Sequence, residues 1–301
     1  MMRQLSENIR QALACPHCLA RLQANEKGAE CAACGRQFAA HGPGLDVRLQ
    51  AEKTARLELT LFRPVPEVAP EIIAPLAPCK QPEVDFTNFD APRHLDANIL
   101  SYFPKSMSAN SLALDLGCGD ESARAACEFA GFEYVGLDYY SPDATLLGDV
   151  HALPLRDESV GFVISLAVLE HIRYPAMMLQ EAHRVLQTGG KLIGSVSFLE
   201  PFHDKSFYHH THLGVFSALD AAGFEVERVA PGLDWDGLKA QAHMILFPRM
   251  PRKIAGWLVW PLRMFHRLWW RVVTSSKPQA DNYGRRLRAT AGGFVFVARK
   301  K

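Results

Sequence analysis

The chain has 301 residues, of which 48% are hydrophobic and 22% are charged. These are the shares of an ordinary globular protein, so wholesale disorder is excluded. The 33 Lys and Arg nearly balance the 32 Asp and Glu. The chain therefore lacks the basic field that gathers polyanions, and nucleic acid is not expected as a partner. The first residues include no apolar stretch of the length that a secretory signal needs, so a cytoplasmic protein is expected.

Four of the seven cysteines form two CxxC pairs near the N-terminus, with twelve residues between the pairs. In a reducing compartment this spacing favours metal over disulfides, because two short hairpins can bring four thiolates to one tetrahedral zinc ion. A redox dithiol is the alternative. Four sulfur ligands leave no open position, so the zinc would be structural. We predict a zinc ribbon in residues 1–50, with the ligands Cys15, Cys18, Cys31 and Cys34.

The cysteine-containing stretch also resembles the zinc-ribbon modules related to the small activator subunit of tRNA and protein methyltransferases. The resemblance covers roughly residues 12–48. It implies a docking or stabilising role for this module.

A change of pattern separates the first part of the chain from the rest. Residues 64–82 hold six prolines, which cannot continue a helix or donate to a sheet, so residues 51–91 are predicted to be a linker. From about residue 92, short apolar runs alternate with helix-length segments, which is typical of βαβ units and a mostly parallel sheet. Strands are predicted at 111–116, 132–138, 159–166, 191–198 and 224–230, with a last one near the C-terminus, and helices at 122–130, 175–187 and 215–222. The fold class is therefore a doubly wound α/β domain over residues 92–301, with an insertion at 231–290.

Two glycines follow the first predicted strand of this domain. Asp115 lies at the strand end, Gly117 and Gly119 precede a helix, and all three are candidate ligand-binding residues. Glycines there let the backbone approach a ligand closely, and the helix N-terminus favours an anionic group. The second strand ends at Asp138, whose carboxylate can accept hydrogen bonds from a ribose diol. A nucleotide-like ligand is predicted, and Ser122 in place of a third glycine disfavours a dinucleotide.

Asp115-Leu-Gly117-Cys-Gly119 and the later run Val168-Leu-Glu-His-Ile172 resemble two motifs of the class I methyltransferases. The resemblance covers about residues 92–230 and implies a Rossmann-like, mostly parallel seven-stranded sheet with S-adenosylmethionine as cofactor. One departure is Glu121, where the family often has a third glycine. The resemblance further implies that Gly117 and Gly119 pack under the methionine part, Asp138 binds the ribose, Asp149 and Val150 hold the adenine, and Leu166 lines the cavity.

The catalytic residues are harder to predict, because methyl transfer depends mainly on positioning, with a base added when the acceptor carries a proton. Several histidines follow the strand that should end at the pocket mouth. A histidine near neutral pKa suits a hydroxyl or amine acceptor. His209 and His210 are the candidate bases, and a plain role in lining the pocket is the alternative. His171 is expected to shape the pocket floor.

Residues 254–273 are both basic and rich in aromatic side chains. Arg263, Arg267 and Arg271 follow at steps of four, which keeps them on one helical face and leaves a broad apolar surface. The charges exclude a spanning helix. The segment is either an interfacial helix on anionic lipid at the inner membrane surface, or a lid over the acceptor pocket or a contact with a second copy; the second option is favoured.

The predicted function is methyl transfer from S-adenosylmethionine to a partly apolar small-molecule acceptor, such as a sugar, a lipid-linked molecule or a secondary metabolite. One alternative is a ribosomal-RNA base methyltransferase, against which the near-neutral charge weighs. The other is a non-catalytic binding module, against which the intact glycine motif and Asp138 weigh.

Overall fold

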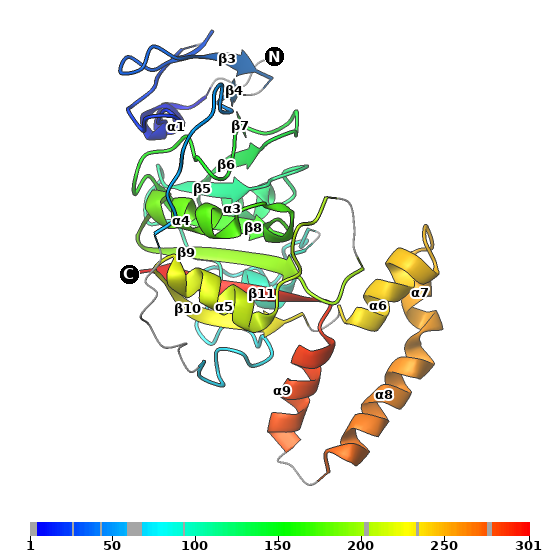
Figure 1. The fold of residues 1–301 in the computed structure, drawn as a ribbon. Helices are drawn as coiled ribbons and strands as arrows, with labels where there is room; N and C mark the ends of the chain where they lie inside the picture. Colours follow the sequence, from blue (N-terminus) through cyan, green and yellow to red (C-terminus); the bar gives the residue numbers. More distant parts are fainter. Residues whose placement is uncertain are drawn as a thin grey trace.

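In the computed structural model a mixed sheet runs from the N-terminal part of the chain to its last strand, and a group of helices extends to one side of it (Figure 1). The described residues are 5–25, 27–42, 44–58, 68–92, 94–201, 205–232, 235–275 and 279–301. Among them the sheet has eleven strands in the order β1-β2-β3-β4-β7-β6-β5-β8-β9-β11-β10.

The centre of the sheet is parallel and buried on both faces. Its strands are β5 (Leu112–Leu116), β6 (Glu133–Asp138), β7 (Leu146–Leu147), β8 (Val160–Leu166) and β9 (Leu186–Ser197). Their apolar runs match this burial, which helices on both faces provide. The strand β9 begins five residues earlier than expected, directly after helix α4, because the glycines at 189 and 190 lie within the strand and do not end a helix.

Two antiparallel strands complete one end of the sheet. They are β10 (Phe224–Pro231) and β11 (Gly293–Lys300), and β11 lies between β9 and β10. The two strands are consecutive in the sheet but are separated in sequence by a long helical segment. The sheet is therefore mixed, although mostly parallel at its centre.

Short helices cover both faces of the sheet. The helices α4 (Pro175–Val185) and α5 (His212–Ala221) pack on the face that includes Leu112 and Leu114. The helices α2 (Ala97–Leu100) and α3 (Arg124–Phe129) pack on the opposite face, with Ala113 and Phe162. This alternation along the strands gives the doubly wound arrangement that the sequence predicts.

The N-terminal module, residues 5–50, continues the sheet. It contains α1 (Glu7–Ala12), β1 (Gln23–Asn25), β2 (Gly28–Glu30), β3 (Gln37–His41) and β4 (Gly44–Asp46). The strand β4 pairs in parallel with β7, so the continuous sheet is larger than the seven strands that the family resemblance implies. The backbone N–H of Ala14 donates to the carbonyl of Pro154 at 2.9 Å. The module and the central domain also share one hydrophobic core.

The predicted linker packs on the domain where the structure describes it; residues 59–67 lie outside the described residues. Leu76 is buried, and the hydroxyl of Tyr102 donates to the carbonyl of Ala77 at 2.9 Å. Glu83 forms an ion pair with Lys191 at 2.9 Å. Prolines prevent regular structure here but leave carbonyls free to accept, so residues 68–91 form part of the domain surface instead of a free connection.

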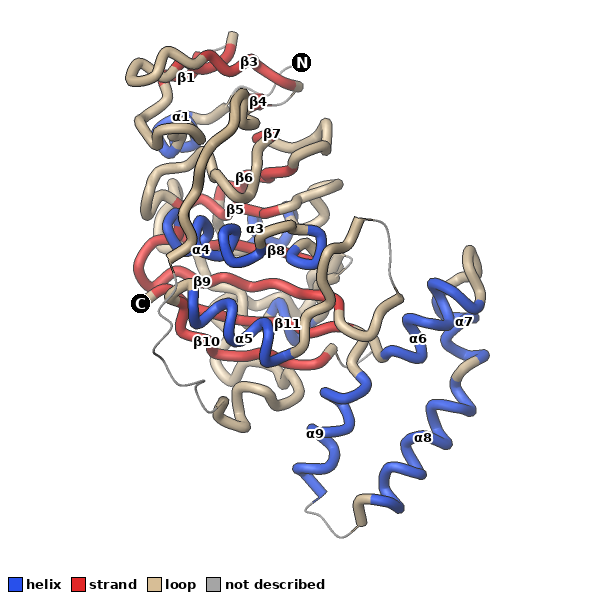
Figure 2. The backbone as a smooth tube through the Cα atoms, viewed as in Figure 1, coloured by secondary structure: helices blue, strands red, loops and turns tan. Residues whose placement is uncertain are grey.

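Between β10 and β11 a helical arm, residues 232–292, extends away from the sheet (Figure 2). Its helices are α6 (Gly237–Gln241), η2 (Ala242–Leu246), α7 (Arg252–Leu258), α8 (Trp260–Val273) and α9 (Gln279–Thr290). The predicted single segment 254–273 is thus two helices that meet at Val259, and Pro261 lies in the first turn of α8, where a missing N–H costs nothing. Within the described part of the chain, every helix is too short or too polar to cross a bilayer.

Candidate functional site

The residues predicted to hold the cofactor gather at one edge of the sheet. They follow the carboxyl ends of the neighbouring parallel strands β5, β6, β7 and β8. Ligands of open α/β sheets bind outside these strand ends. Leu166 is the last residue of β8 and is half-buried. The topology therefore brings together residues as far apart in sequence as Asp115 and Leu166.

The turn after β5 depends on its two glycines. Gly117 has φ +71°, and a Cβ added there would lie 2.6 Å from a methyl group of Val168, the first residue of the second motif. Gly119 has φ +52°, and a Cβ added there would have no heavy atom within 4 Å. Gly117 is thus required by packing as well as by conformation. Gly119 leaves open space in which a ligand can approach the backbone.

Asp138 stabilises this turn from the neighbouring strand. Its Oδ1 accepts hydrogen bonds from the backbone N–H groups of Tyr140 at 2.8 Å and Ser141 at 2.9 Å. Its Oδ2 accepts one from Gly119 at 3.2 Å. A carboxylate has about four lone-pair positions, so Asp138 retains capacity to accept from a ligand hydroxyl.

Glu121, the departure from the family pattern, also has a positive φ, of +57°. Its Oε2 forms an ion pair with Arg124 at 2.6 Å. Its Oε1 is buried close to Gly136, where an added Cβ would lie 2.9 Å from it. The carboxylate therefore lies under the turn, against β6.

Asp115 is almost completely buried beneath the turn, and its Oδ2 accepts a hydrogen bond from the hydroxyl of Tyr134 at 2.6 Å. Burial raises the pKa of Asp115 to about 7, although the bond from Tyr134 acts in the opposite direction. Asp115 thus contacts Tyr134 in the core, whereas the glycines that follow it are at the surface of the turn. Its predicted contact with the cofactor stays a prediction.

Asp149 and Val150, predicted to hold adenine, follow β7. Asp149 Oδ1 accepts from the backbone N–H of His151 at 2.9 Å and lies 2.6 Å from His151 Nδ1. Burial alone would raise the pKa of Asp149, but these bonds outweigh it and the pKa is lowered. Val150 is buried, and the imidazole of His151 packs edge-on against Tyr174. A hydrogen-bonded carboxylate thus stands beside an apolar side chain, which suits a purine edge.

A cavity of about 680 Å³, which we call the central cavity, lies beside these strand ends. Ala167, which directly follows Leu166, is in its wall, and so are the residues at the end of β9. His94, His171 and His243 also line it. His171 was expected at the pocket floor, but His94 and His243 were not expected, since they come from a loop before β5 and from the arm, and no spacing pattern connects them.

The two candidate bases lie apart from this cavity. His210 is half-buried, its backbone N–H donates to the carbonyl of Ser197 at 2.8 Å, and its Nε2 is buried without a partner among the described residues. Burial lowers the pKa of His210. His210 lines neither the central cavity nor the pocket described next. His209 is exposed and lies on the wall of that second pocket.

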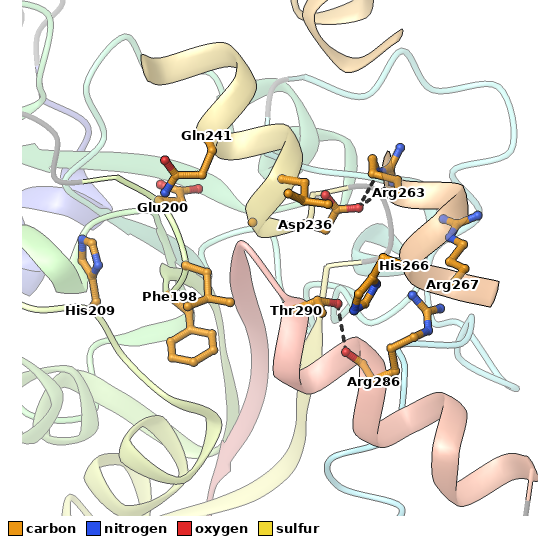
Figure 3. A pocket seen from close by; sticks show the side chains of 13 residues that line it. Phe198, Glu200, His209, Asp236, Gln241, Arg263, His266, Arg267, Arg286 and Thr290 are labelled. Atoms are coloured by element: carbon orange, nitrogen blue, oxygen red, sulfur yellow. Dashed lines mark hydrogen bonds and ion pairs between the residues drawn. The ribbon is translucent and has the colours of Figure 1, made fainter. Parts of the chain in front are cut away.

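The second pocket, which we call the arginine pocket, has a volume of about 460 Å³ and lies between the end of β9 and the arm (Figure 3). Glu200 lines both this pocket and the central cavity. Ser197 Oγ donates towards Glu200 Oε2 at 2.9 Å, and the indole N–H of Trp235 donates to Glu200 Oε1. The basic side chains come from the arm and are Arg263, His266, Arg267 and Arg286.

The four cysteines of the N-terminal module converge, as their spacing predicts. All four Sγ atoms lie within 4.8 Å of one another. The separations are 3.7 Å between Cys15 and Cys34 and 3.5 Å between Cys18 and Cys31. Four sulfurs at about 2.3 Å from a tetrahedral zinc are separated by roughly 3.8 Å, so the arrangement fits a zinc ion.

Comparison with known proteins agrees with the geometry of the strand ends. Residues 114–194 match the family described as methyltransferase domain. The match extends from β5 into β9, the part of the chain whose motifs resemble those of the class I methyltransferases.

The chain is similar to two curated proteins over part of its length. A Mycolicibacterium smegmatis protein, named as a probable S-adenosylmethionine-dependent methyltransferase, is 30% identical over 138 residues, which are 38% of this chain and 52% of that protein. An uncharacterized protein in a Streptomyces fradiae transposon is 36% identical over 98 residues, covering 27% of this chain and 28% of that protein. The chain thus spans about half or less of these relatives.

Solved structures show weaker similarity. One is a chain in the complex between the Haloferax volcanii Trm112 methyltransferase activator and a putative methyltransferase. It is 20% identical with a TM-score of 0.41, and the aligned region covers 67% of this chain and 86% of that chain. An S-adenosylmethionine-dependent methyltransferase from Mesorhizobium loti is 16% identical with a TM-score of 0.38. The aligned region covers 62% of this chain and 90% of that chain.

Proposed function

We propose that the protein transfers a methyl group from S-adenosylmethionine to a small-molecule acceptor. The observation that carries the proposal is the glycine turn, where Gly119 leaves open space and Asp138 faces it with capacity to accept hydrogen bonds. When bound there, the cofactor supplies a methyl group on a positively charged sulfur. Asp138 accepts from the ribose, Asp149 and Val150 contact the adenine, and Leu166 lines the cavity.

The central cavity is the proposed site of the acceptor, since it begins at Ala167, next to the proposed cofactor residues. The chain's main contribution is to hold the acceptor in line and to exclude water. His209 stays a proposed base for an acceptor that extends from the central cavity into the arginine pocket, whose wall it lines. His210 is a weaker candidate, because its Nε2 is buried. His171 lines the central cavity and is added as a third candidate.

The test is incubation with tritiated S-adenosylmethionine and fractionated extracts of small molecules, lipids and RNA. Label in the small-molecule or lipid fraction supports the proposal. Label in RNA alone would favour the ribosomal-RNA alternative. Cofactor binding without label in any fraction would favour the non-catalytic module.

We further propose that the outer face of α7 and α8 rests on an anionic membrane. The helix α8 has no buried residue, and its arginine side faces the arginine pocket, where Arg263 forms an ion pair with Asp236 at 2.6 Å. Residues 237–280 contain eight Lys and Arg but no Asp or Glu. This charge repels a second copy and attracts anionic lipid. Large apolar side chains on α7 and α8 are more than 40% exposed, namely Ile254, Trp257, Leu258, Trp260, Leu262, Met264, Phe265, Leu268, Trp269, Val272 and Val273.

Replacing Trp257 and Trp269 with Ala should weaken binding to vesicles of phosphatidylcholine and phosphatidylserine by about tenfold per residue, because burying a large apolar side chain contributes on the order of 1.5 kcal/mol. Vesicle sedimentation measures the effect, with the exposed Met107→Ala as control. Binding should decline as salt rises. A wild-type dimer that dissociates in the double variant, without any vesicle binding, would contradict the membrane assignment.

A further inference from the structure

The arginine pocket is lined by arginines at one end and by a carboxylate at the other. Figure 3 shows Arg263, Arg267 and Arg286 at one end, and Glu200 and His209 at the other. Positions 263 and 267 are four residues apart on α8, so their side chains share a face. The α9 helix supplies Arg286 from the opposite wall. Two helices therefore direct their guanidinium groups into one space.

The positive charge at this end is only partly balanced. Asp236 Oδ2 pairs with Arg263 at 2.6 Å. Arg267 and Arg286 have no ion pair among the described residues, and Arg286 lies over the ring of Tyr283, 5.5 Å from its centre. Burial, and then the charge of Arg267, lower the pKa of Arg286. Two arginines that line one pocket without an ion pair of their own repel each other, and a bound anion would relieve that repulsion.

The chemistry of these groups selects the kind of anion. Planar guanidinium groups bind phosphate oxygens in pairs, and their geometry matches phosphate better than an ammonium group does. Two unpaired arginines from facing helices can together neutralise a doubly charged group such as a phosphate. A ligand with a single carboxylate carries one negative charge and would need only one of them. A volume of about 460 Å³ is within the range of small-molecule sites.

We propose that the arginine pocket binds a phosphate or diphosphate group, through Arg267 and Arg286. In so far as this group belongs to the methyl acceptor, the inference rests on the proposed function. The acceptor would then run from the arginines past Phe198 and Leu238 to Glu200, which also borders the central cavity. Contacts to the phosphate would position the acceptor from a point remote from its reacting atom. Enzymes commonly use binding energy from such remote contacts to orient a substrate.

Inorganic pyrophosphate tests the site without the cofactor. Isothermal titration should show saturable binding to the full chain, about tenfold weaker in Arg267→Gln and again in Arg286→Gln, because each change removes a charge-assisted bidentate contact. The control is Arg285→Gln, a neighbouring residue on α9 that is exposed and does not line the pocket. Titration with S-adenosylmethionine should be unchanged in all three variants, so failure of this inference is separable from failure of the proposed function.

Vesicles distinguish a soluble from a lipid-borne phosphate. Phosphatidylcholine vesicles are prepared with either a polyprenyl phosphate or phosphatidylserine at equal charge. A preference for the polyprenyl phosphate that Arg267→Gln and Arg286→Gln abolish assigns the group to a lipid. Equal binding to both vesicles, with weakened pyrophosphate binding in the variants, assigns it to a soluble acceptor. No saturable pyrophosphate binding, or the same affinity in the two variants and in Arg285→Gln, would overturn the proposal.

Discussion

Replacing Asp138 with Ala should weaken binding of S-adenosylmethionine by one to two orders of magnitude. A carboxylate that accepts from a ribose is a charge-assisted contact, and such contacts contribute roughly 1.5–3 kcal/mol. Titration of the purified variant measures the loss.

Because Asp138 also accepts from Gly119, Tyr140 and Ser141, the substitution loosens the turn itself. Thermal unfolding of the cofactor-free protein isolates that contribution. Asp143→Ala is the matched control, since Asp143 is an exposed carboxylate in the same loop. Equal affinity in the Asp138 variant and the wild type would rule out the assigned ribose contact.

We also propose that the four cysteines bind one structural zinc ion per chain, and that Cys31→Ser abolishes this binding and unfolds the N-terminal module. Structural zinc contributes on the order of 10–16 kcal/mol of apparent binding energy in small zinc-finger peptides, far more than a module of this size obtains from its core. Metal analysis and limited proteolysis of residues 1–50 measure the two effects.

The control for the zinc prediction is Cys79→Ser, because Cys79 is a half-buried free cysteine outside the cluster. That variant should retain zinc and protease resistance. A freshly reduced, folded wild-type protein without zinc would disprove the assignment. A redox dithiol would instead retain its fold without metal and titrate with thiol reagents.

The sequence predicts what depends on local rules. Glycine spacing predicts the turn after β5, since only glycine adopts positive φ without strain, and apolar runs predict the buried strands. Cysteine spacing predicts that four sulfurs converge. In each case the signal lies within a few residues of the structure that it specifies.

Contacts between distant segments have no such signal. The pairing of β4 with β7 joins residues about a hundred positions apart, and two buried residues in each strand do not specify a partner. The same holds for Glu200, whose place between two cavities depends on Ser197 and on Trp235 from the arm. The amphipathic pattern of α8 predicts two faces but not which of them is turned inwards, and the ion pair of Arg263 with Asp236 turns the arginine face inwards.

The register of the last two strands shows that the helical arm is an insertion between two strands that pair directly with each other. Pro231 pairs with Phe294, so the ends of the arm lie side by side, as the ends of a tight hairpin loop do. Lengthening such a loop costs little, since closure entropy grows only with the logarithm of its length. The whole arm, residues 232–292, can thus be gained, lost or exchanged at this point while β10 and β11 keep their pairing. On the proposed function, selectivity for the acceptor could therefore change with the arm, while the glycine turn after β5 stays the same.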